Sequence, residues 1–293
     1  MTPAPITHVP SGTDGKEAML HITSASQGAR VRLETLPTAP PKKALKADAK
    51  TEFDALGEEL FDLQDLLWGA RMNSVLIVLQ GRDTAGKDGT IKHVVGSLNP
   101  RGVSVASFAA PSTEEREHDF LWRIHRHTPR QGEFSIFNRS HYEDVLAVRV
   151  HDLAPRSLWK ERYGHIRDFE EMLSEHGTIV LKFFLHISQK EQEQRLLARE
   201  EEPRKAWKIS AGDWEDRRHW AAYTRAYHDV FARTSTKNAP WTIVPADAKW
   251  YRNLVVARTV AAALRPYRKR WQQRLDEVGA KKKAELRTWR KKQ

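Results

Sequence analysis

The sequence predicts an α/β protein in which helices cover both faces of a parallel sheet. Short apolar runs alternate along the chain with segments whose apolar residues recur at three- and four-residue steps, and these periods are typical of strands and helices. Regular alternation favours a parallel sheet, because parallel strands need a crossover between them. With 293 residues and 40% apolar content, the chain can bury one substantial core. We see no internal repeat and expect a single domain with appendages.

The first elements follow a long N-terminal segment. Residues 1–47 carry prolines among small and polar residues and should be extended or partly disordered. Apolar residues at helical spacing over 53–67 predict an amphipathic helix that packs on the sheet. The apolar run at 75–79 should be the first strand, and a glycine-rich loop at 81–90 leads from it into a helix.

The later elements follow from apolar runs and capping residues. Strands are expected at 103–107 and 134–137, and between them Ser112 and Glu115 should form a capping box that opens a helix running to about Arg126. The remaining elements should follow in this order: a helix at about 158–175, the longest apolar strand at 178–187, a helix capped by Ser188 and Glu191, a long helix at about 213–234, a strand at 241–244 and a helix at 249–264.

The loop at 81–90 is the most informative segment for function. Gly81 and Gly86 have the spacing that lets a chain leave a buried strand and wrap its backbone N–H groups around a polyanion. The helix that follows presents its positive end to the same anion. Lys87 then supplies a flexible cation for phosphoryl oxygens. We therefore predict a phosphate-binding loop, called the P-loop below.

Two carboxylates make this P-loop unusual. Asp88 occupies the position where most P-loop enzymes carry a Ser or Thr that binds Mg²⁺. Asp83 lies inside the loop, where it would repel a triphosphate unless it holds a metal ion or receives a proton. The alternative is that Asp83 caps a turn and that Asp88 favours the first helical turn by its charge.

Two polar segments are expected at the ligand-binding edge of the sheet. Residues 138–144 follow the strand at 134–137, and α/β sheets bind ligands at the carboxyl ends of their strands. Residues 199–210 form a cationic segment in which Pro203 stops the preceding helix. Such a segment can close as a lid over phosphates and exclude water. The alternative is a solvated basic loop with Trp207 packed as a core aromatic.

The positive charge is concentrated at the C-terminus. The chain has a net charge of +11, and residues 265–293 hold twelve Lys or Arg against three Asp or Glu. The rest of the chain is therefore nearly neutral. This tail could contact nucleic acid, another polyanion or a neighbouring subunit, or it could be a solvated helix face.

Composition also bears on location. The chain has no cysteine and therefore no disulfide framework. No stretch resembles an 18-residue apolar span, and residues 1–16 lack the apolar core of a signal peptide. We expect a soluble, cytoplasmic protein that does not span a membrane.

Three segments together resemble the motifs of family-2 polyphosphate kinases. The P-loop of that family has an Asp two residues after its first Gly and a Gly rather than a hydroxyl residue near its Lys, which is similar to Gly81, Asp83, Gly86, Lys87 and Gly89. The family's second motif resembles residues 137–144. Its lid resembles Arg199, Pro203, Lys205, Trp207, Lys208 and Ser210. The resemblance covers roughly residues 53–264.

The resemblance implies phosphoryl transfer between inorganic polyphosphate and a nucleotide, with Mg²⁺ or Mn²⁺, on a P-loop kinase fold similar to that of thymidylate kinase. We expect this kinase domain at 48–264, with its lid at about 199–234 and a basic helical tail at 265–293. The family also suggests a homo-oligomer, either a dimer or a tetramer.

Site residues can be carried over onto the matching positions. Asp83, Lys87 and Arg139 are expected to be catalytic, with Asp83 holding the metal ion. Phosphate-binding residues are expected to be Gly81, Gly86, Gly89, Thr90, Arg199, Lys205 and Lys208. Candidates on the nucleotide side are Asn138, Tyr142, Glu143 and Asp144. Many family members carry Asp where this chain has Asn138, so Glu143 or Asp144 could supply a metal-binding carboxylate instead.

The second motif resembles that of the family's third class, whose members phosphorylate AMP to ADP and ADP to ATP. Two other functions stay open. A conventional P-loop kinase would use ATP to phosphorylate a nucleotide or small metabolite, which the absence of Ser or Thr at Asp88 disfavours. A non-catalytic module would bind nucleic acid through the basic tail, and then the P-loop and lid motifs would be coincidences.

Overall fold

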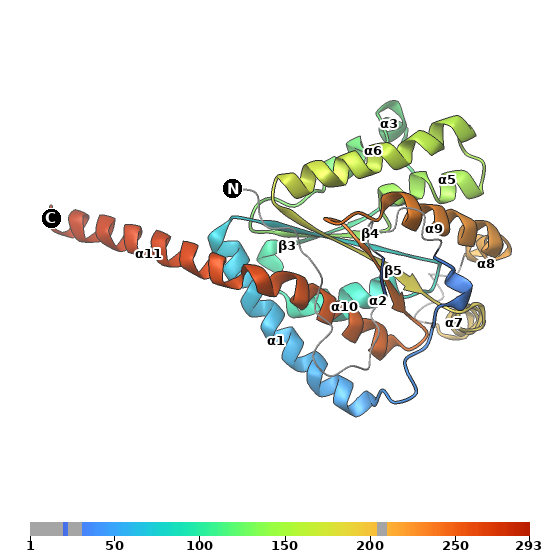
Figure 1. Ribbon diagram of the computed structural model, residues 1–293, viewed down its shortest axis with the longest axis horizontal. Coiled ribbons are helices and arrows are strands. Elements are labelled where there is room, and N and C mark those ends of the chain that lie inside the picture. The colour runs from blue at the N-terminus through green and yellow to red at the C-terminus, as the bar shows by residue number, and fades with distance from the viewer. Residues whose placement is uncertain (1–19, 23–30, 204–209) are drawn as a thin grey trace.

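The computed structural model describes residues 20–22, 31–203 and 210–293, and these form a six-stranded sheet between two layers of helices (Figure 1). The described strands are β1 (Leu20–Ile22), β2 (Ser74–Gly81), β3 (Val103–Ser107), β4 (Phe134–Asn138), β5 (Thr178–His186) and β6 (Trp241–Pro245). The described α-helices are α1 (Lys46–Ala70), α2 (Lys87–Val94), α3 (Thr113–Glu117), α4 (Trp122–His125), α5 (Ala147–Val150), α6 (Arg156–Glu175), α7 (Gln189–Glu201), α8 (Ala211–Arg218), α9 (Trp220–Thr234), α10 (Lys249–Leu264) and α11 (Arg268–Arg290).

The strand that precedes the P-loop lies inside the sheet. The strand order is β1-β6-β5-β2-β4-β3, so β2 pairs in parallel with β5 on one side and with β4 on the other. The pairs β3–β4 and β5–β6 are also parallel, whereas β1 pairs with β6 in the antiparallel direction. The predicted parallel α/β sheet is confirmed for β2 to β6. The edge strand β1 lies within residues 1–47, where the sequence analysis expects no strand.

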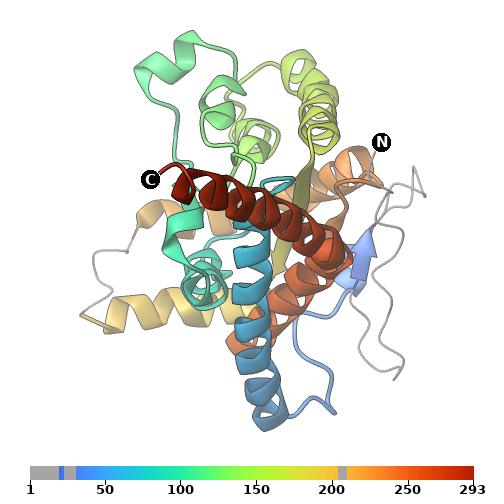
Figure 2. The same cartoon turned by 90° about the vertical axis from the view of Figure 1, so that its left-hand side faces the viewer.

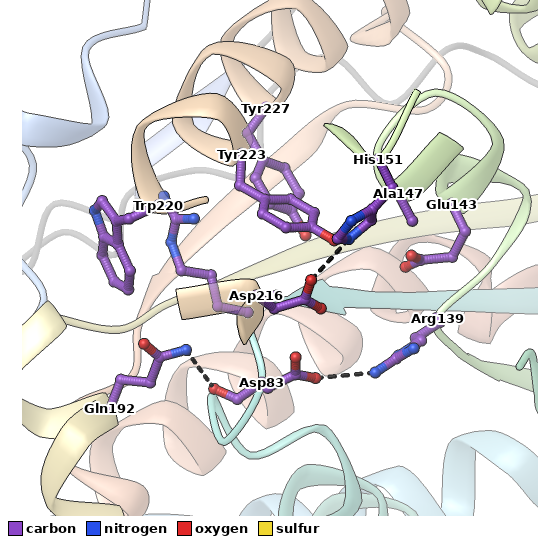
Figure 3. A pocket seen from close by; sticks show the side chains of 12 residues that line it. Asp83, Arg139, Glu143, Ala147, His151, Gln192, Asp216, Trp220, Tyr223 and Tyr227 are labelled. Carbon is purple, nitrogen blue, oxygen red and sulfur yellow. Dashed lines mark hydrogen bonds and ion pairs between the residues drawn. The ribbon is translucent and has the colours of Figure 1, made fainter. Parts of the chain in front are cut away.

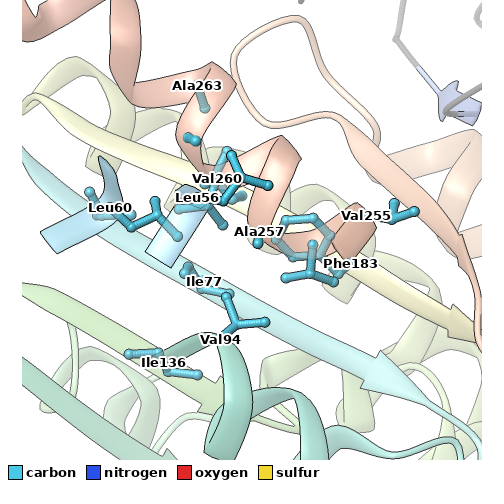
Figure 4. Close-up of a cluster of buried hydrophobic side chains, with 14 of the residues drawn as sticks. Leu56, Leu60, Ile77, Val94, Ile136, Phe183, Val255, Ala257, Val260 and Ala263 are labelled. Atoms are coloured by element: carbon cyan, nitrogen blue, oxygen red, sulfur yellow. The ribbon is translucent and has the colours of Figure 1, made fainter. Parts of the chain in front are cut away.

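Alternate side chains of β2 build two separate cores. Val75 and Ile77 belong to the core that α1, α2 and α10 cover (Figure 4). Leu76 and Val78 belong to the core on the opposite face, which α6 and α9 cover. A strand that is buried on both faces has a continuous apolar sequence, and this is why the run at 75–79 predicts β2 correctly.

A buried ion pair ties the second core together. Lys182, in the middle of β5, donates hydrogen bonds to Glu170 Oε2 (2.6 Å), to the hydroxyl of Tyr142 (2.9 Å) and to the carbonyl of Thr234 (2.7 Å). Both charged side chains are almost completely buried. These contacts join β5 to α6, to the turn after β4 and to the end of α9.

Two helices predicted as continuous are broken. Ser112 and Glu115 form the expected capping box, but the backbone is extended at His118. The carboxylate of Asp119 then accepts backbone N–H bonds at the start of the next turn, so α3 and α4 are separate helices. The helix predicted at 213–234 is broken at His219 into α8 and α9. Both breaks arise from local contacts that helical periodicity does not encode.

The C-terminal helix starts on the body and then leaves it. Trp271 is fully buried, and its indole N–H donates to Asn73 Oδ1 (3.0 Å). Leu275 lies directly against Gly69 where α11 crosses the end of α1 (Figure 2). The hydrophobic core therefore extends past the domain boundary predicted at residue 264. Beyond Gly279 the helix projects away from the rest of the molecule (Figure 1).

Within the described ranges, every helix is too short or too polar to cross a lipid bilayer.

Candidate active site

The P-loop forms the turn between β2 and α2. Gly86 has a φ of 104° and precedes the first residue of α2. A Cβ atom at Gly86 would lie only 1.8 Å from Nη1 of Arg252. A glycine is therefore required here both by the positive φ and by the close approach of a guanidinium group.

Lys87 reaches back across the loop that it follows. Its Nζ donates to the carbonyl of Gly81 (2.8 Å) and lies 3.4 Å from the carbonyl of Arg82. The side chain is buried, and this burial lowers the pKa of Lys87, while nearby Asp83 acts in the opposite direction. The structure thus holds the predicted cation inside the P-loop.

An ion pair joins the P-loop to the motif after β4. Arg139 Nη2 donates to Asp83 Oδ1 at 2.9 Å. Arg139 itself has a positive φ of 62°, which is uncommon for a residue other than glycine and often marks a functional turn. Burial opposes the charge of Arg139, but Glu143 and Asp83 outweigh this effect and raise its pKa. The sequence analysis expected these two residues at one site, and the structure brings them into contact.

A large cationic pocket lies on the α2 side of this ion pair. It encloses about 1640 Å³, partly open to solvent, and we call it the P-loop pocket. Asp83, Gly86, Gly89 and Asn138 line it. Its cationic side chains are Lys87, Arg139, Arg195, Arg199, Lys249 and Arg252. A pocket with this lining suits a chain of phosphate groups.

A smaller pocket lies on the other side and is rich in aromatic rings. It encloses about 550 Å³, partly open to solvent, and we call it the aromatic pocket. It is lined by three aromatic residues of α9, Trp220, Tyr223 and Tyr227 (Figure 3). His151 and Asp216 also line it and form an ion pair at 2.7 Å. Aromatic faces of this kind can stack on a nucleobase.

The ion pair between Asp83 and Arg139 faces both pockets, because each of its members lines both. Glu143 points into the aromatic pocket close to Arg139 (Figure 3). Burial raises the pKa of Glu143, although Arg139 and Lys87 oppose this shift. One cluster of charges therefore separates two pockets of different chemical character.

Asn138 and Asp88 meet at the P-loop pocket. Asn138 Nδ2 donates to Asp88 Oδ1 at 2.9 Å. Gly89 lies beside the guanidinium of Arg252. The hydroxyl of Thr90 is turned to the backbone instead, donating to the carbonyl of Gly86 (3.2 Å). Thr90 is buried and does not line the pocket that the described residues form.

Two candidates of the second motif face away from both pockets. Tyr142 is fully buried, and its hydroxyl donates to Glu170 Oε1 (2.7 Å). Asp144 pairs with Arg162 (2.9 Å) and lies 3.9 Å from Arg123. The 3-10 turn at His141–Asp144 explains this divergence, because successive side chains in such a turn point in different directions. Glu143 is thus the carboxylate of this motif that reaches the site.

Part of the predicted lid lies outside the described residues. Arg199 lines the P-loop pocket and pairs with Asp213 Oδ2 at 2.8 Å, which links α7 to α8. Lys205 and Lys208 lie in the range 204–209, outside the described residues. Their role as phosphate ligands therefore stays a prediction.

Two arginines behind the P-loop were not predicted from the sequence. Arg195 Nη1 donates to the carbonyl of Thr84 (2.9 Å), and Arg252 Nη1 donates to the carbonyl of Ala85 (3.3 Å). Burial, with a smaller contribution from Arg195, lowers the pKa of Arg252 to about 10. Arg252 lies in the predicted helix at 249–264, and a charged residue on its apolar face is the signal that could have revealed it.

A third missed arginine lies at the aromatic pocket. The guanidinium of Arg82 lies 3.7 Å from the ring centroid of Trp220, a cation–π contact. Burial lowers the pKa of Arg82 to about 10. This contact fixes the start of α9 against the P-loop, and it depends on the helix break at His219.

Comparison with known proteins gives one consistent result. The family described as polyphosphate kinase 2 (PPK2) matches residues 43–272. The AMP/ADP-polyphosphate phosphotransferase of Meiothermus ruber is 52% identical over 209 residues, which cover 71% of this chain and 78% of that protein. The ADP-polyphosphate phosphotransferase of Rhodopseudomonas palustris is 45% identical over 219 residues, which cover 71% of this chain and 76% of that protein. The crystal structure of polyphosphate kinase 2 from Arthrobacter aurescens is 40% identical, with a TM-score of 0.78 over 84% of this chain and 91% of that one.

Proposed function

This chain belongs to the polyphosphate kinase 2 family, and we propose that it transfers phosphoryl groups between inorganic polyphosphate and the adenine nucleotides AMP and ADP. The observation that carries this proposal is the pair of pockets that share Asp83 and Arg139. Two substrates in these pockets would meet at the shared ion pair.

The lining of each pocket suggests its occupant. Polyphosphate is a flexible polyanion, and it fits the P-loop pocket with its six cationic side chains. The nucleoside fits the aromatic pocket, where α9 presents an indole and two phenol rings. Both phosphate termini would then reach Asp83 and Arg139.

The reaction is a direct transfer. An oxygen of the nucleotide's terminal phosphate attacks the terminal phosphorus of polyphosphate. The bond from that phosphorus to its bridging oxygen breaks, and the shortened chain leaves with the electron pair. Negative charge spreads over the transferring group in the transition state. Lys87, Arg139 and the backbone N–H groups of the P-loop would stabilise that charge.

The carboxylates fit a magnesium ion shared with the substrate. The described residues contain no cluster of three or more His, Asp or Glu side chains that could hold a metal. Mg²⁺ is commonly bound by one or two carboxylates together with substrate phosphates and water, so such a cluster is not required. We assign Asp83 as the metal-binding carboxylate, with Glu143 as the second candidate. When bound, the ion would neutralise phosphate oxygens during transfer. Asp144 is unsuitable because it lines neither pocket.

Acceptance of both AMP and ADP is the finer part of the proposal. The two acceptors differ by one phosphate, so the base must shift for either terminal phosphate to reach the same point. Asn138, expected from the sequence on the nucleotide side, lines the P-loop pocket and not the aromatic pocket, so its neutral side chain does not explain this acceptance. The relative from Meiothermus ruber is named an AMP/ADP-polyphosphate phosphotransferase, and this similarity supports the assignment.

An assay with polyphosphate as the sole phosphoryl donor tests the proposal. Purified protein with polyphosphate, Mg²⁺ and ADP should yield ATP, and AMP should yield ADP and then ATP with no other enzyme present. Lys87→Ala serves as the control for contaminating kinases. ATP from ADP with no product from AMP would overturn the AMP/ADP class. No product from either nucleotide, with activity only when ATP is the donor, would indicate a conventional P-loop kinase.

A further inference from the structure

The second half of α11 is a helix without a supporting surface. All side chains from Ala280 onward are exposed in the single chain, including two large apolar ones, Leu286 (45% exposed) and Trp289 (59%). After Gly279, the last residue of α11 that is partly buried, the helix runs outward from the body (Figures 1 and 2). It cannot fold back on its own chain without breaking. We call residues 280–293 the C-terminal arm.

The arm has one face on which apolar and basic side chains gather. This face carries four residues at intervals of four, three and one positions: Lys282, Leu286, Trp289 and Arg290. This spacing places them on one stripe of an α-helix. Further positive charge flanks the stripe, because the arm contains Lys281, Lys283, Arg287, Lys291 and Lys292 and a single acidic residue, Glu285.

Helix α1 carries a matching stripe of opposite charge. Five exposed residues share one face of this helix: Asp54, Glu58, Phe61, Asp62 and Asp65. Phe61 is 42% exposed at the centre of this face. No hydrogen bond or ion pair links these four carboxylates to any other described residue. We call these five residues the acidic face of α1.

The two stripes are complementary in charge, and both carry exposed apolar side chains. Leu286 and Trp289 lie among the basic residues of the arm, and Phe61 lies among the carboxylates of α1. The stripe from Lys282 to Arg290 is about 12 Å long and would cover most of the acidic face, which is about 17 Å long from Asp54 to Asp65 at 1.5 Å per residue. We propose that the C-terminal arm of one chain docks on the acidic face of α1 in a second copy of this chain.

A twofold axis would make this contact twice. In such a dimer each chain gives its arm and receives its partner's arm, so the same pair of surfaces is used at both contacts. Leu286 and Trp289 would cover Phe61, and the lysines and arginines would face the carboxylates of α1. A polyanion could neutralise the arm, but it would leave Leu286, Trp289 and Phe61 exposed. The second copy accounts for all of these features.

Charge reversal on each surface tests the proposal. One variant carries Glu58→Lys with Asp62→Lys, and the other carries Lys282→Glu with Arg290→Glu. Each variant alone would place like charges opposite each other at the reversed positions of both contacts, and its dimer dissociation constant should rise at least about tenfold. A mixture of the two variants should dimerise again, because the reversed positions of one variant then face opposite charges on the other. The readout is the mass of the full-length chain by sedimentation or light scattering.

The matched control reverses two exposed charges on α6. Glu171→Lys with Glu175→Lys changes the net charge as the α1 variant does and uses the same four-residue spacing. It should leave the assembly state unchanged. Turnover with saturating substrates checks that every variant is folded, because none of these residues lines either pocket.

Three outcomes would overturn the proposal. The first is that the wild-type chain stays monomeric at about 100 μM. The second is that the α6 control loses as much dimer as the α1 and arm variants. The third is that mixing the two variants fails to restore the dimer. A reversal on the arm that lowers polyphosphate use without changing the mass would show that the arm binds a polyanion instead. Because the readout is mass, these results are independent of whether the proposed reaction is correct.

Discussion

At the scale of single residues, the site depends on a few charges held in fixed positions. Lys87 is anchored to the carbonyl of Gly81, and Asp83 is anchored to Arg139. Lys87→Ala should lower turnover by about 10²-fold or more, because a preorganised cation matters most as charge spreads in the transition state. Asp83→Asn should lose a comparable amount if Asp83 holds the metal ion as we propose. Steady-state rates with polyphosphate and ADP measure both, and near-normal turnover in a folded variant would contradict the assigned roles.

The buried state of Lys87 also predicts a pH effect. Burial lowers its pKa, so the ammonium group loses its proton at a lower pH than the ordinary value of about 10.4. kcat/KM should therefore decline on the alkaline side earlier than an exposed lysine would allow. Lys87→Arg keeps a proton throughout this range, and whatever activity remains should lack that decline. The same alkaline decline in both proteins would assign it to another group.

The residues found from the sequence are those that belong to a continuous motif. Asp83 and Lys87 lie in the P-loop itself, and Arg139 directly follows a predicted strand. Arg195 and Arg252 were missed because they reach the loop from helices α7 and α10, far away in the sequence. Tyr142 and Asp144 were chosen for their place in a polar motif, although the turn directs Tyr142 into the core and Asp144 to Arg162, away from both pockets.

At the scale of elements, α7 and α8 carry the described parts of the predicted lid. Arg199→Ala should raise KM for polyphosphate and reduce its salt dependence, with a smaller effect on kcat, because it would remove the proposed phosphate contact and leave Asp213 unpaired in the P-loop pocket. Arg217→Ala is the matched control. Arg217 also joins α7 to α8, through Glu193 at 2.7 Å, but it lines neither pocket. Equal effects of the two changes would indicate a purely structural role for Arg199.

The junction of β5 and α6 depends on the buried pair Lys182 and Glu170. Glu170→Gln should cost about 3–5 kcal/mol of unfolding free energy, because it leaves an ammonium group buried without a counter-charge. Adding Lys182→Met should recover part of this loss. Exposed Glu171→Gln should change stability by no more than about 0.5 kcal/mol. Urea unfolding measures all four proteins, and a Glu170→Gln cost below about 1 kcal/mol would contradict the assignment.

Element boundaries were predictable where burial or capping determines them. β3 and α10 have the predicted limits, and the capping box before α3 forms as expected. The breaks at His118 and His219 were not predictable, since each depends on what the neighbouring side chains contact. Trp220 is the clearest case, because its partner Arg82 is in the P-loop.

At the scale of the whole molecule, the body and the arm should separate at Gly279. Removing residues 280–293 should leave kcat/KM within about twofold of wild type, because these residues line neither pocket. It should hardly change the unfolding free energy of the monomer, because these residues are exposed in the single chain. Truncation after Arg265 also removes Trp271, which is fully buried. It should cost at least about 3–5 kcal/mol, the typical loss for deleting a buried Trp. Thermal and urea unfolding distinguish the two truncations, and equal stability would contradict the packing of α11 on α1.

Asp83 and Arg139 face both pockets, so in the proposed reaction the same two side chains would meet the phosphoryl group whether it leaves polyphosphate or leaves ATP. Synthesis and consumption of ATP then cross the same barrier. By microscopic reversibility, no substitution at either residue can change the Haldane ratio of forward and reverse kinetic constants. That ratio equals the equilibrium constant of the reaction in solution. Neither residue can make the enzyme one-way. The direction of net flux is therefore set by the concentrations of ADP, ATP and polyphosphate around the protein.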